Sequence, residues 1–296
     1  MPDSVEDRGP TAGREGGPRV DETVIRGLRA ARNAGYRLLD PLDRLVRRVA
    51  RKDELPPLSL RRHAGPVKAF ESSTEALFGL LAWMGLPGAG TRLLDLGCGP
   101  GAVPLRLERG RVAVRGYVGV DVHEPSILWC RRRFAARETF RFELAGVRSP
   151  YGRADAADPV GYRFPVEDAG ADLVLAKSLF THLLLETARH YLSEIRRCLS
   201  PGGRGVLTAF VFDGTTGGPP AFPHHGENPS IRWRRRVHPH AAVAYDRRLF
   251  EEMLSGSGLE ILEMLPGFWP GLSPRLRGQD TFIVSTATAG PGEPGR

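Results

Sequence analysis

The stretch LLDLGCGPG at residues 93–101 constrains the fold of this chain more than any other. An apolar run there ends in an acid, and glycines follow at Gly97, Gly99 and Gly101. Because glycine lacks a Cβ atom, such a loop turns tightly and lets the backbone approach a ligand closely. Pro100 suits the start of a helix, whose N-terminus attracts anions. We therefore predict a ligand site at this loop. The loop alone is compatible with a phosphate, a dinucleotide or an amino acid as the ligand.

Apolar strand patterns alternate with helical patterns after this loop. This order predicts an α/β fold with a doubly wound, mostly parallel sheet and crossover helices. One helix is clear, because Ala188, Leu192 and Ile195 share a face and the stretch SPGG at 200–203 ends it. The predicted strands are 92–96, 115–121, 139–144, 172–176, 205–212, 259–265 and 281–285.

The N-terminal region repeats apolar residues at helical spacing from Val24 to about Arg51. Proline removes a backbone donor, so Pro41 is predicted to divide this region into two helices. Arginines crowd the polar faces. They are consistent with a solvated helix face, or with a clamp for an anionic substrate or a membrane surface.

Residues 1–22 and 287–296 are rich in glycine, proline and charge, which predicts disordered tails. The predicted organisation is a tail at 1–22, an N-terminal helical extension at 23–69, one α/β domain at 70–286 and a tail at 287–296. No apolar run has the length of a membrane span, and no apolar signal region opens the chain, so we expect a cytoplasmic protein. Three scattered cysteines indicate neither a disulfide framework nor a zinc site.

The formal net charge is +8, which by itself favours a nucleic-acid partner. Only Lys52, Lys68 and Lys177 are lysines, however, and every other base is arginine. Together with abundant Gly, Pro and Ala, this is typical of GC-rich codon usage. We therefore expect no nucleic-acid partner.

Two acids narrow the choice of ligand. The loop has GxGxG spacing, whereas dinucleotide loops read GxGxxG. Asp95 lies two residues before the first glycine, where its charge disfavours a pyrophosphate and favours an ammonium or sulfonium ion. Asp121 ends the second predicted strand, 20 residues after Gly101, where a carboxylate can accept hydrogen bonds from two ribose hydroxyls.

The ordered set LLDLGCGPG, VGVD, FPVEDAGADLVLAKSLFTHL, LSPGGRGVLT and GLEILE resembles the Rossmann-like (class I) S-adenosylmethionine-dependent methyltransferases over roughly residues 70–286. The resemblance implies a seven-stranded sheet with an antiparallel last strand, and S-adenosylmethionine as the cofactor. It implies that the glycine loop holds the methionine end, Asp121 the ribose, and Val122 the adenine. The implied cofactor-binding residues are Asp95, Gly97, Cys98, Gly99, Gly101, Asp121 and Val122.

The chain departs from this family after the third predicted strand. Many relatives have an acid there that contacts the adenine amine, whereas this chain reads LAGVR at 144–148. Asp155 or Asp158 could substitute from the following loop.

Ser178 and His182 follow the fourth predicted strand, whose end faces the transferred methyl group in this family. A hydroxyl nucleophile must lose its proton, which suits a histidine with a pKa near neutrality. His182 is therefore the predicted catalytic residue and Ser178 a predicted substrate contact. The alternative is that His182 only orders the loop beneath the site.

The segment 213–245 is too long for a tight connection. It carries four histidines and four arginines, and long loops at this end of such sheets often cover the substrate. We predict a lid in which His224, His225 and Arg232 contact the substrate; a flexible excursion without a role is the alternative. No acid cluster accompanies these histidines, so we predict no metal.

The leading hypothesis is a methyltransferase that acts on a hydroxyl of a small polar metabolite, such as a sugar or a glycosylated natural product. The charge would suit an RNA or protein methyltransferase, but the chain lacks an (N/D)PPY or catalytic cysteine motif. The loop spacing and Asp95 disfavour a nicotinamide oxidoreductase. A non-catalytic protein that binds S-adenosylmethionine is the remaining alternative.

Overall fold

A computed structural model describes residues 22–152, 156–214, 219–267 and 279–286. Both predicted disordered tails lie outside these residues, except that Glu22 begins the first helix. In the described part of the chain, no helix combines the length and the apolar character needed to cross a membrane.

Three helices precede the sheet: α1 (Glu22–Val49), α2 (Leu58–His63) and α3 (Val67–Trp83). The predicted division at Pro41 is wrong, because α1 is one bent helix through this proline. Two aspartates hold the chain in helical register on either side of it. The backbone N–H of Ser59 donates to Asp40 at 2.9 Å and that of Leu58 to Asp43 at 3.1 Å. These hydrogen bonds satisfy the first backbone N–H groups of α2, and they attach α2 to α1, so they stabilise both helices.

The central sheet is mostly parallel, with strands in the order β3-β2-β1-β4-β5. β10 lies antiparallel between β5 and β9, which confirms the predicted fold class and its antiparallel last strand. The bounds are β1 Arg92–Leu96, β2 Gly116–Asp121, β3 Phe140–Leu144, β4 Ala171–Ala176, β5 Leu199–Phe212, β9 Leu259–Leu265 and β10 Asp280–Thr286.

The segment 213–245 is more ordered than the predicted loop. It forms β6 (His224–His225), β7 (Ile231–Trp233) and β8 (Val243–Asp246), so the sheet has ten strands among the described residues in place of the expected seven. β8 pairs in parallel with Phe210–Phe212, the last residues of β5. The 14-residue β5 is longer than its neighbours, and its far end offers unpaired backbone groups to this addition.

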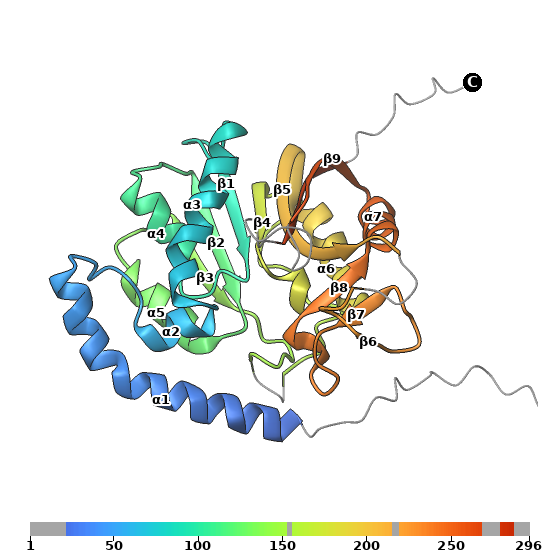
Figure 1. The fold of residues 1–296 in the computed structure, drawn as a ribbon. Coiled ribbons are helices and arrows are strands. Elements are labelled where there is room, and N and C mark those ends of the chain that lie inside the picture. The colour runs from blue at the N-terminus through green and yellow to red at the C-terminus, as the bar shows by residue number, and fades with distance from the viewer. Residues whose placement is uncertain (1–21, 153–155, 215–218, 268–278, 287–296) are drawn as a thin grey trace, which may run out of the picture.

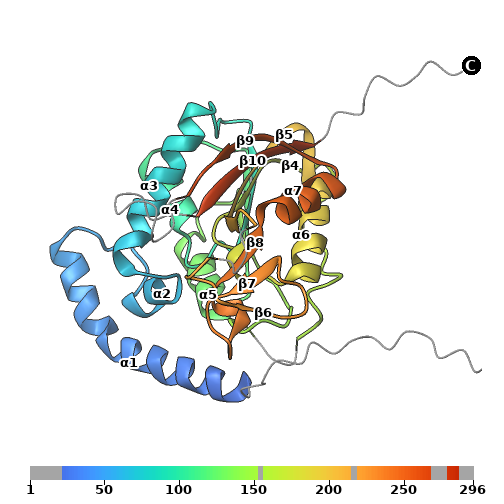
Figure 2. The ribbon, with the colours of Figure 1, turned by 45° about the vertical axis from the view of Figure 1, so that its right-hand side comes forward.

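Helices cover both faces of the sheet (Figures 1 and 2). α3, α4 (Ala102–Arg109) and α5 (Glu124–Arg133) pack on one face, and α6 (Leu185–Cys198) and α7 (Arg247–Gly256) pack on the other. Side chains alternate between the two cores along each strand. Leu93, Leu173 and Leu175 face the α3 side, whereas Leu94 and Leu96 face the α6 side. Each strand therefore contributes side chains to both cores.

Candidate active site

A cavity lies at the carboxyl ends of β1, β2 and β4, where ligands bind in doubly wound sheets. Strand order reverses there, since the chain moves outward from β1 to β3 and then returns to β4. Its polar lining comes from the strand ends and from segments that cover them. The lining includes His63, Gly97, Gly99, Asp121, Val122, Val147, Tyr151, Tyr162, Phe164, Lys177, Ser178, His182, Thr187 and His240.

The glycine loop has the left-handed backbone that glycine favours, with φ of 75° at Gly97, 52° at Gly99 and 78° at Gly101. The backbone N–H groups of Gly97 and Cys98 donate to the Val120 carbonyl at 2.8 and 3.1 Å, which folds the loop back against β2. Gly97 and Gly99 line the cavity. Gly101 has a packing role, because a Cβ atom there would lie 3.0 Å from the Cys130 sulfur.

Asp121 ties β2 to this loop. Its carboxylate accepts the N–H of Gly99 at 2.8 Å and the N–H of His123 at 2.7 Å. Burial raises the pKa of the Asp121 carboxyl, and these backbone bonds oppose the rise. The side chain also lines the cavity, so Asp121 both shapes the loop and offers a carboxylate to a ligand.

Asp95 lies beneath the loop and is only 3% exposed. It shares the α3 face of the sheet with Tyr117, whose hydroxyl donates to it at 2.7 Å. Burial raises the pKa of Asp95 to about 6, while the Tyr117 hydrogen bond and the Lys177 ammonium oppose the rise. Its carboxylate is therefore part-ionised near neutral pH.

Lys177 is a cavity residue that the sequence reasoning missed. It follows β4 on the face of Leu173 and Leu175, and its ammonium donates to the Ser73 hydroxyl on α3 at 2.8 Å. Burial lowers the pKa of Lys177, and the Asp95 carboxylate opposes this. The alternation of apolar residues along β4 was the signal that could have placed this lysine beside Asp95.

Ser178 has a left-handed backbone, with φ of 59°, which is strained for a residue with a Cβ atom. Two contacts hold it there. Its N–H donates to the Thr208 hydroxyl at 2.7 Å, and its own hydroxyl accepts the Gln279 side-chain N–H at 2.9 Å. The turn carries the chain from β4 into the short helix η1 (Phe180–His182).

His182 and His240 bind each other's backbone. Nδ1 of His182 lies 2.8 Å from the His240 carbonyl, and Nδ1 of His240 lies 2.9 Å from the His182 carbonyl. A carbonyl oxygen only accepts hydrogen bonds, so the Nδ1 atom of each ring carries a proton and donates it to the backbone of the other residue. The Tyr151 hydroxyl lies 3.2 Å from the same nitrogen of His182. These contacts fix the orientation of the His182 ring in the cavity wall.

A row of rings covers the cavity. The His63 ring, at the end of α2, stacks on His123 with centroids 3.5 Å apart. It meets Tyr151 edge-on at 5.9 Å, and Tyr151 meets His182 at 5.0 Å. Burial lowers the pKa of His123 to about 4, and the nearby Arg37 charge adds to this, so its ring is neutral. The N-terminal extension thus forms part of the cavity, which the sequence did not indicate.

Residues 94–207 match the family model for the methyltransferase domain. This part of the chain is therefore a methyltransferase domain, in agreement with the resemblance to the Rossmann-like, S-adenosylmethionine-dependent methyltransferases. The match runs from the middle of β1 to the middle of β5 and so includes the glycine loop, Asp121 and His182.

Solved structures with this fold include two methyltransferases. A Burkholderia thailandensis 1,6-didemethyltoxoflavin-N1-methyltransferase, crystallised with S-adenosylhomocysteine, is 18% identical over 77% of this chain and 84% of its own, with a TM-score of 0.50. A Leishmania major S-adenosylmethionine-dependent methyltransferase is 12% identical over 75% of each chain, with a TM-score of 0.50. The [4+2]-cyclase SpnF is 23% identical over 64% of this chain, with a TM-score of 0.46. This chain matches 59% of the cyclase's length.

The methyltransferase domain brings together most of the predicted site residues. Gly97, Gly99, Asp121 and Val122 line the cavity with Ser178 and His182. Asp95, Cys98 and Gly101 lie in the layer beneath, where Cys98 is buried and burial raises its thiol pKa well above the usual value.

The lid residues are placed differently. Among the described residues that line the cavity, the segment 213–245 contributes His240 and none of His224, His225 or Arg232. His224 and His225 form β6, which pairs only with β7 in the described sheet. Arg232 is buried, with its guanidinium 5.8 Å from the Phe212 ring. The substrate contacts assigned to these three residues stay predictions.

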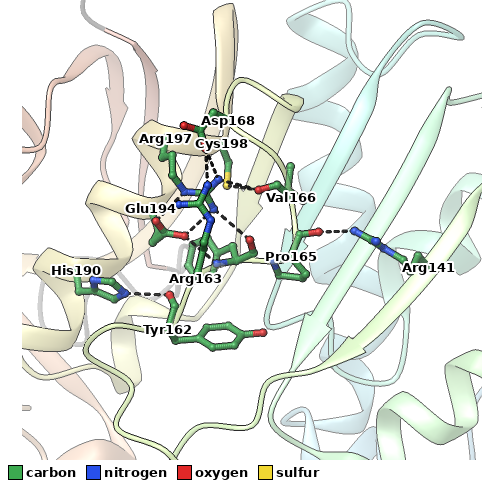
Figure 3. A network of polar contacts seen from close by, with 11 residues as sticks. Arg141, Tyr162, Arg163, Pro165, Val166, Asp168, His190, Glu194, Arg197 and Cys198 are labelled. Atoms are coloured by element: carbon green, nitrogen blue, oxygen red, sulfur yellow. Dashed lines mark hydrogen bonds and ion pairs between the residues drawn. The ribbon is translucent and has the colours of Figure 1, made fainter.

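A network of polar contacts fixes another wall of the methyltransferase cavity (Figure 3). Arg197 on α6 donates to the carbonyls of Phe164 at 3.1 Å and Val166 at 2.7 Å, and it pairs with Glu194 at 2.7 Å. Glu194 accepts the Phe164 N–H at 2.8 Å. The loop 162–166 is therefore held to α6, and Tyr162 and Phe164 on it line the cavity.

The alternative adenine contacts are not resolved at this site. Asp155 lies outside the described residues, and Asp158 pairs with Arg148 at 3.0 Å on the surface. In the described part of the chain, no group of three or more His, Cys, Asp and Glu side chains is arranged to hold a metal ion.

Proposed function

We propose that this methyltransferase methylates a hydroxyl of a small polar metabolite, such as a sugar or a glycosylated natural product. The observation that carries the proposal is the position of His182 in the cavity wall with Nδ1 held by the His240 carbonyl. A hydroxyl must lose its proton as it attacks, whereas a neutral amine already has a lone pair. An oriented imidazole with a basic Nε2 supplies that base.

The residues present fit S-adenosylmethionine. Asp121 offers a carboxylate for ribose hydroxyls, and Val122 and Val147 offer an apolar surface for an adenine ring. An amino acid carries an ammonium and a carboxylate. Lys177 lines the cavity, and the Asp95 carboxylate lies in the layer beneath it, close enough to oppose the lowering of the Lys177 pKa. We assign the methionine end to this pair.

The division of labour follows from this placement. When bound, the cofactor supplies a methyl group made electrophilic by the sulfonium. The strained turn at Ser178 and the His182–His240 bonds fix the position of the base. The rings of His63, Tyr151 and His240 line the same cavity, where they can shield a bound cofactor and acceptor from water and so strengthen charge interactions.

The proposal of a small polar acceptor rests on the hydroxyl groups of Tyr151, Ser178 and Thr187, which line the same cavity as His182. These groups can hold the remaining hydroxyls of a sugar through hydrogen bonds. His63 of α2 and His240 of the segment 213–245 also line the cavity. Cover from these two segments disfavours a nucleic-acid strand or a folded protein as the substrate.

Two measurements test the proposal. Calorimetry with the full chain is expected to show binding of S-adenosylmethionine and S-adenosylhomocysteine and no binding of NAD. The chain is then incubated with methyl-labelled S-adenosylmethionine and separately with the small-molecule, RNA and protein fractions of a cell extract. A labelled methyl ether in the small-molecule fraction supports the proposal. Label in RNA or protein, or on a nitrogen atom, overturns the substrate class. Cofactor binding without any labelled product favours a non-catalytic binding protein.

A further inference from the structure

Helix α1 contacts the rest of the protein through its polar side. Arg47 is 8% exposed and donates to the Leu55 carbonyl at 2.7 Å and to Asp43 at 2.7 Å. Asp43 also pairs with Arg61 of α2, and Asp40 accepts the Ser59 hydroxyl at 2.6 Å. These charged groups are satisfied where α1 meets α2. The polar stripe of this helix therefore attaches it to the protein, the reverse of the usual arrangement.

The apolar side of α1 faces outward. Leu38 is 83% exposed and Val49 is 78% exposed. At 100° per residue, their stripe spans an arc of roughly 120°. Its members are Leu38, Leu39, Leu42, Leu45, Val46 and Val49, all of them exposed. Figures 1 and 2 show α1 along the outside of the molecule, next to α2 and away from the sheet. We call these six residues the outer stripe.

The charges beside the outer stripe have one sign. Over Ala31–Val49 the exposed charged side chains are all arginines, and they are Arg32, Arg37, Arg44 and Arg48. The two aspartates of this stretch are half-buried against α2. The exposed surface of the helix is thus apolar along one stripe and cationic beside it.

We propose that α1 docks this protein on an anionic lipid bilayer, with the outer stripe in the headgroup layer and the flanking arginines on lipid phosphates. Leucine and valine side chains gain free energy when they leave water for the acyl boundary. Arginines flanking such a stripe extend toward anionic headgroups, and their charge attracts the protein to the surface. The helix lies on the membrane and does not span it.

The charges favour a bilayer over a second copy of the chain. Two copies packed through the outer stripe would bring arginines together, with no exposed carboxylate on Ala31–Val49 to pair with them. A nucleic acid would use the arginines but leave six apolar side chains in water. An anionic bilayer can bury the outer stripe and at the same time pair its phosphates with the flanking arginines.

Vesicle co-sedimentation of the full chain tests the proposal. Vesicles of phosphatidylcholine with phosphatidylglycerol are expected to bind the protein, and vesicles of phosphatidylcholine alone to bind it at least about tenfold more weakly. Binding is expected to fall as salt is raised, because screening weakens the arginine contribution.

Variants separate the two contributions. Leu42→Glu with Leu45→Glu is expected to reduce partitioning by at least about a hundredfold. Its matched control, Leu262→Glu on β9, changes a leucine that is 44% exposed elsewhere and is expected to bind like the parent. Arg44→Gln with Arg48→Gln is expected to reduce binding about twentyfold, and Arg132→Gln, an exposed arginine of α5, to change it little.

S-adenosylhomocysteine binding checks that each variant is folded, since none of these residues lines the described cavity. No binding of the parent to anionic vesicles at low salt overturns the proposal, as does unchanged binding of the double glutamate variant. A dimer in light scattering that the same glutamates dissociate, without vesicle binding, would assign the outer stripe to self-association instead.

Discussion

The two sides of the cavity are built in different ways. One side consists of strand ends, where Gly97, Asp121 and Lys177 follow β1, β2 and β4 at one edge of the sheet. The opposite side consists of rings from segments far apart in the chain, with His63 from α2, Tyr151 from the loop after β3, and His240 from the segment before β8. Backbone pairing sets the first side, and side-chain contacts set the second.

This difference suggests a division of roles. The strand ends carry the charges and backbone groups that suit a cofactor, whereas the ring side holds the predicted base and covers the site. Substitutions on the sheet side are then expected to change cofactor affinity, and substitutions near the ring side to change turnover or closure. Single substitutions and titrations with pH test this division.

His182→Ala is expected to have the largest effect. Removal of the base should lower kcat by roughly 10²–10⁴ with little change in cofactor affinity. The measurement is kcat with the acceptor identified from the labelled fraction, beside calorimetry with S-adenosylhomocysteine. A loss of affinity or stability in place of kcat would assign His182 to ordering the loop. A change below about tenfold would argue against a hydroxyl acceptor.

Asp121→Ala is expected to act on binding. The variant loses the ribose contact and also releases the N–H groups of Gly99 and His123, so affinity for S-adenosylhomocysteine should fall by about 1–3 kcal/mol. Asp121→Asn is the control, because its amide oxygen can still accept one backbone bond and should recover part of the loss. Unchanged affinity in calorimetry would refute the assignment of Asp121.

The pH dependence of cofactor binding tests Asp95. Its pKa near 6 means that the carboxyl gains charge as pH rises from about 5 to 7, and the charged form attracts the cofactor's ammonium. Affinity is therefore expected to rise up to about tenfold over this range, with proton release on binding near pH 6. Titrations in buffers of different ionisation heat measure this release. Asp95→Asn keeps an acceptor for the Tyr117 hydroxyl and should abolish the pH step; persistence of the step would assign it to another group.

Folding stability should change with pH in the opposite sense. The raised pKa of Asp95 means that the native state holds its proton to higher pH than the unfolded chain. Its contribution therefore weakens stability as pH rises from about 4 to 6. A difference in melting temperature between the parent and Asp95→Asn that grows from about pH 4 to 6 and is constant above it supports the assignment.

His63→Ala tests whether the cover reaches the cofactor. It removes the stack on His123, and an aromatic stack contributes about 0.5–1.5 kcal/mol. Affinity for S-adenosylhomocysteine is expected to fall by about three- to tenfold. His63→Phe keeps a ring and should recover most of it. Equal affinity in all three proteins would show that α2 covers the cavity without contributing to cofactor binding.

His225→Ala is expected to have the smallest effect. This exposed residue of β6 lies outside the described cavity lining, so kcat and KM should each change by less than about twofold. A marked rise in KM would support the predicted substrate contact and would show that the segment 213–245 reaches the acceptor in the working enzyme.

The sequence predicted the sheet side of the site better than the ring side, for a physical reason. Residues at the ends of parallel strands meet at one edge whatever surrounds them, so Gly97, Asp121 and Ser178 could be grouped before any contact was known. Lys177 was missed because it entered only the argument about net charge. Its position, two residues after Leu175 on the same face of the chain, was not considered.

The ring side depends on pairings that no local pattern records. His240 reaches the cavity because it directly precedes β8, which pairs with the far end of β5. His224 and His225 instead lie in β6, which pairs with β7. His63 was overlooked because α2 was read only as part of a helical extension. The predicted helix break at Pro41 was wrong for a related reason. Hydrogen bonds from α2 to Asp40 and Asp43 stabilise the helix enough to offset the backbone donor that proline lacks.

The anchor formed by Arg197 has a consequence for how this cavity could change over evolution. Arg197 holds the loop 162–166 through the carbonyl groups of Phe164 and Val166, and every residue type has a carbonyl. The path of this wall is therefore largely independent of the side chains that it displays. Tyr162 is only half-buried, so it can be exchanged for other residues while the loop keeps its course; Phe164 is a core residue that also packs on Tyr191. Acceptor selectivity can thus diverge here by single substitutions, and a library that varies position 162 is a direct route to new acceptors.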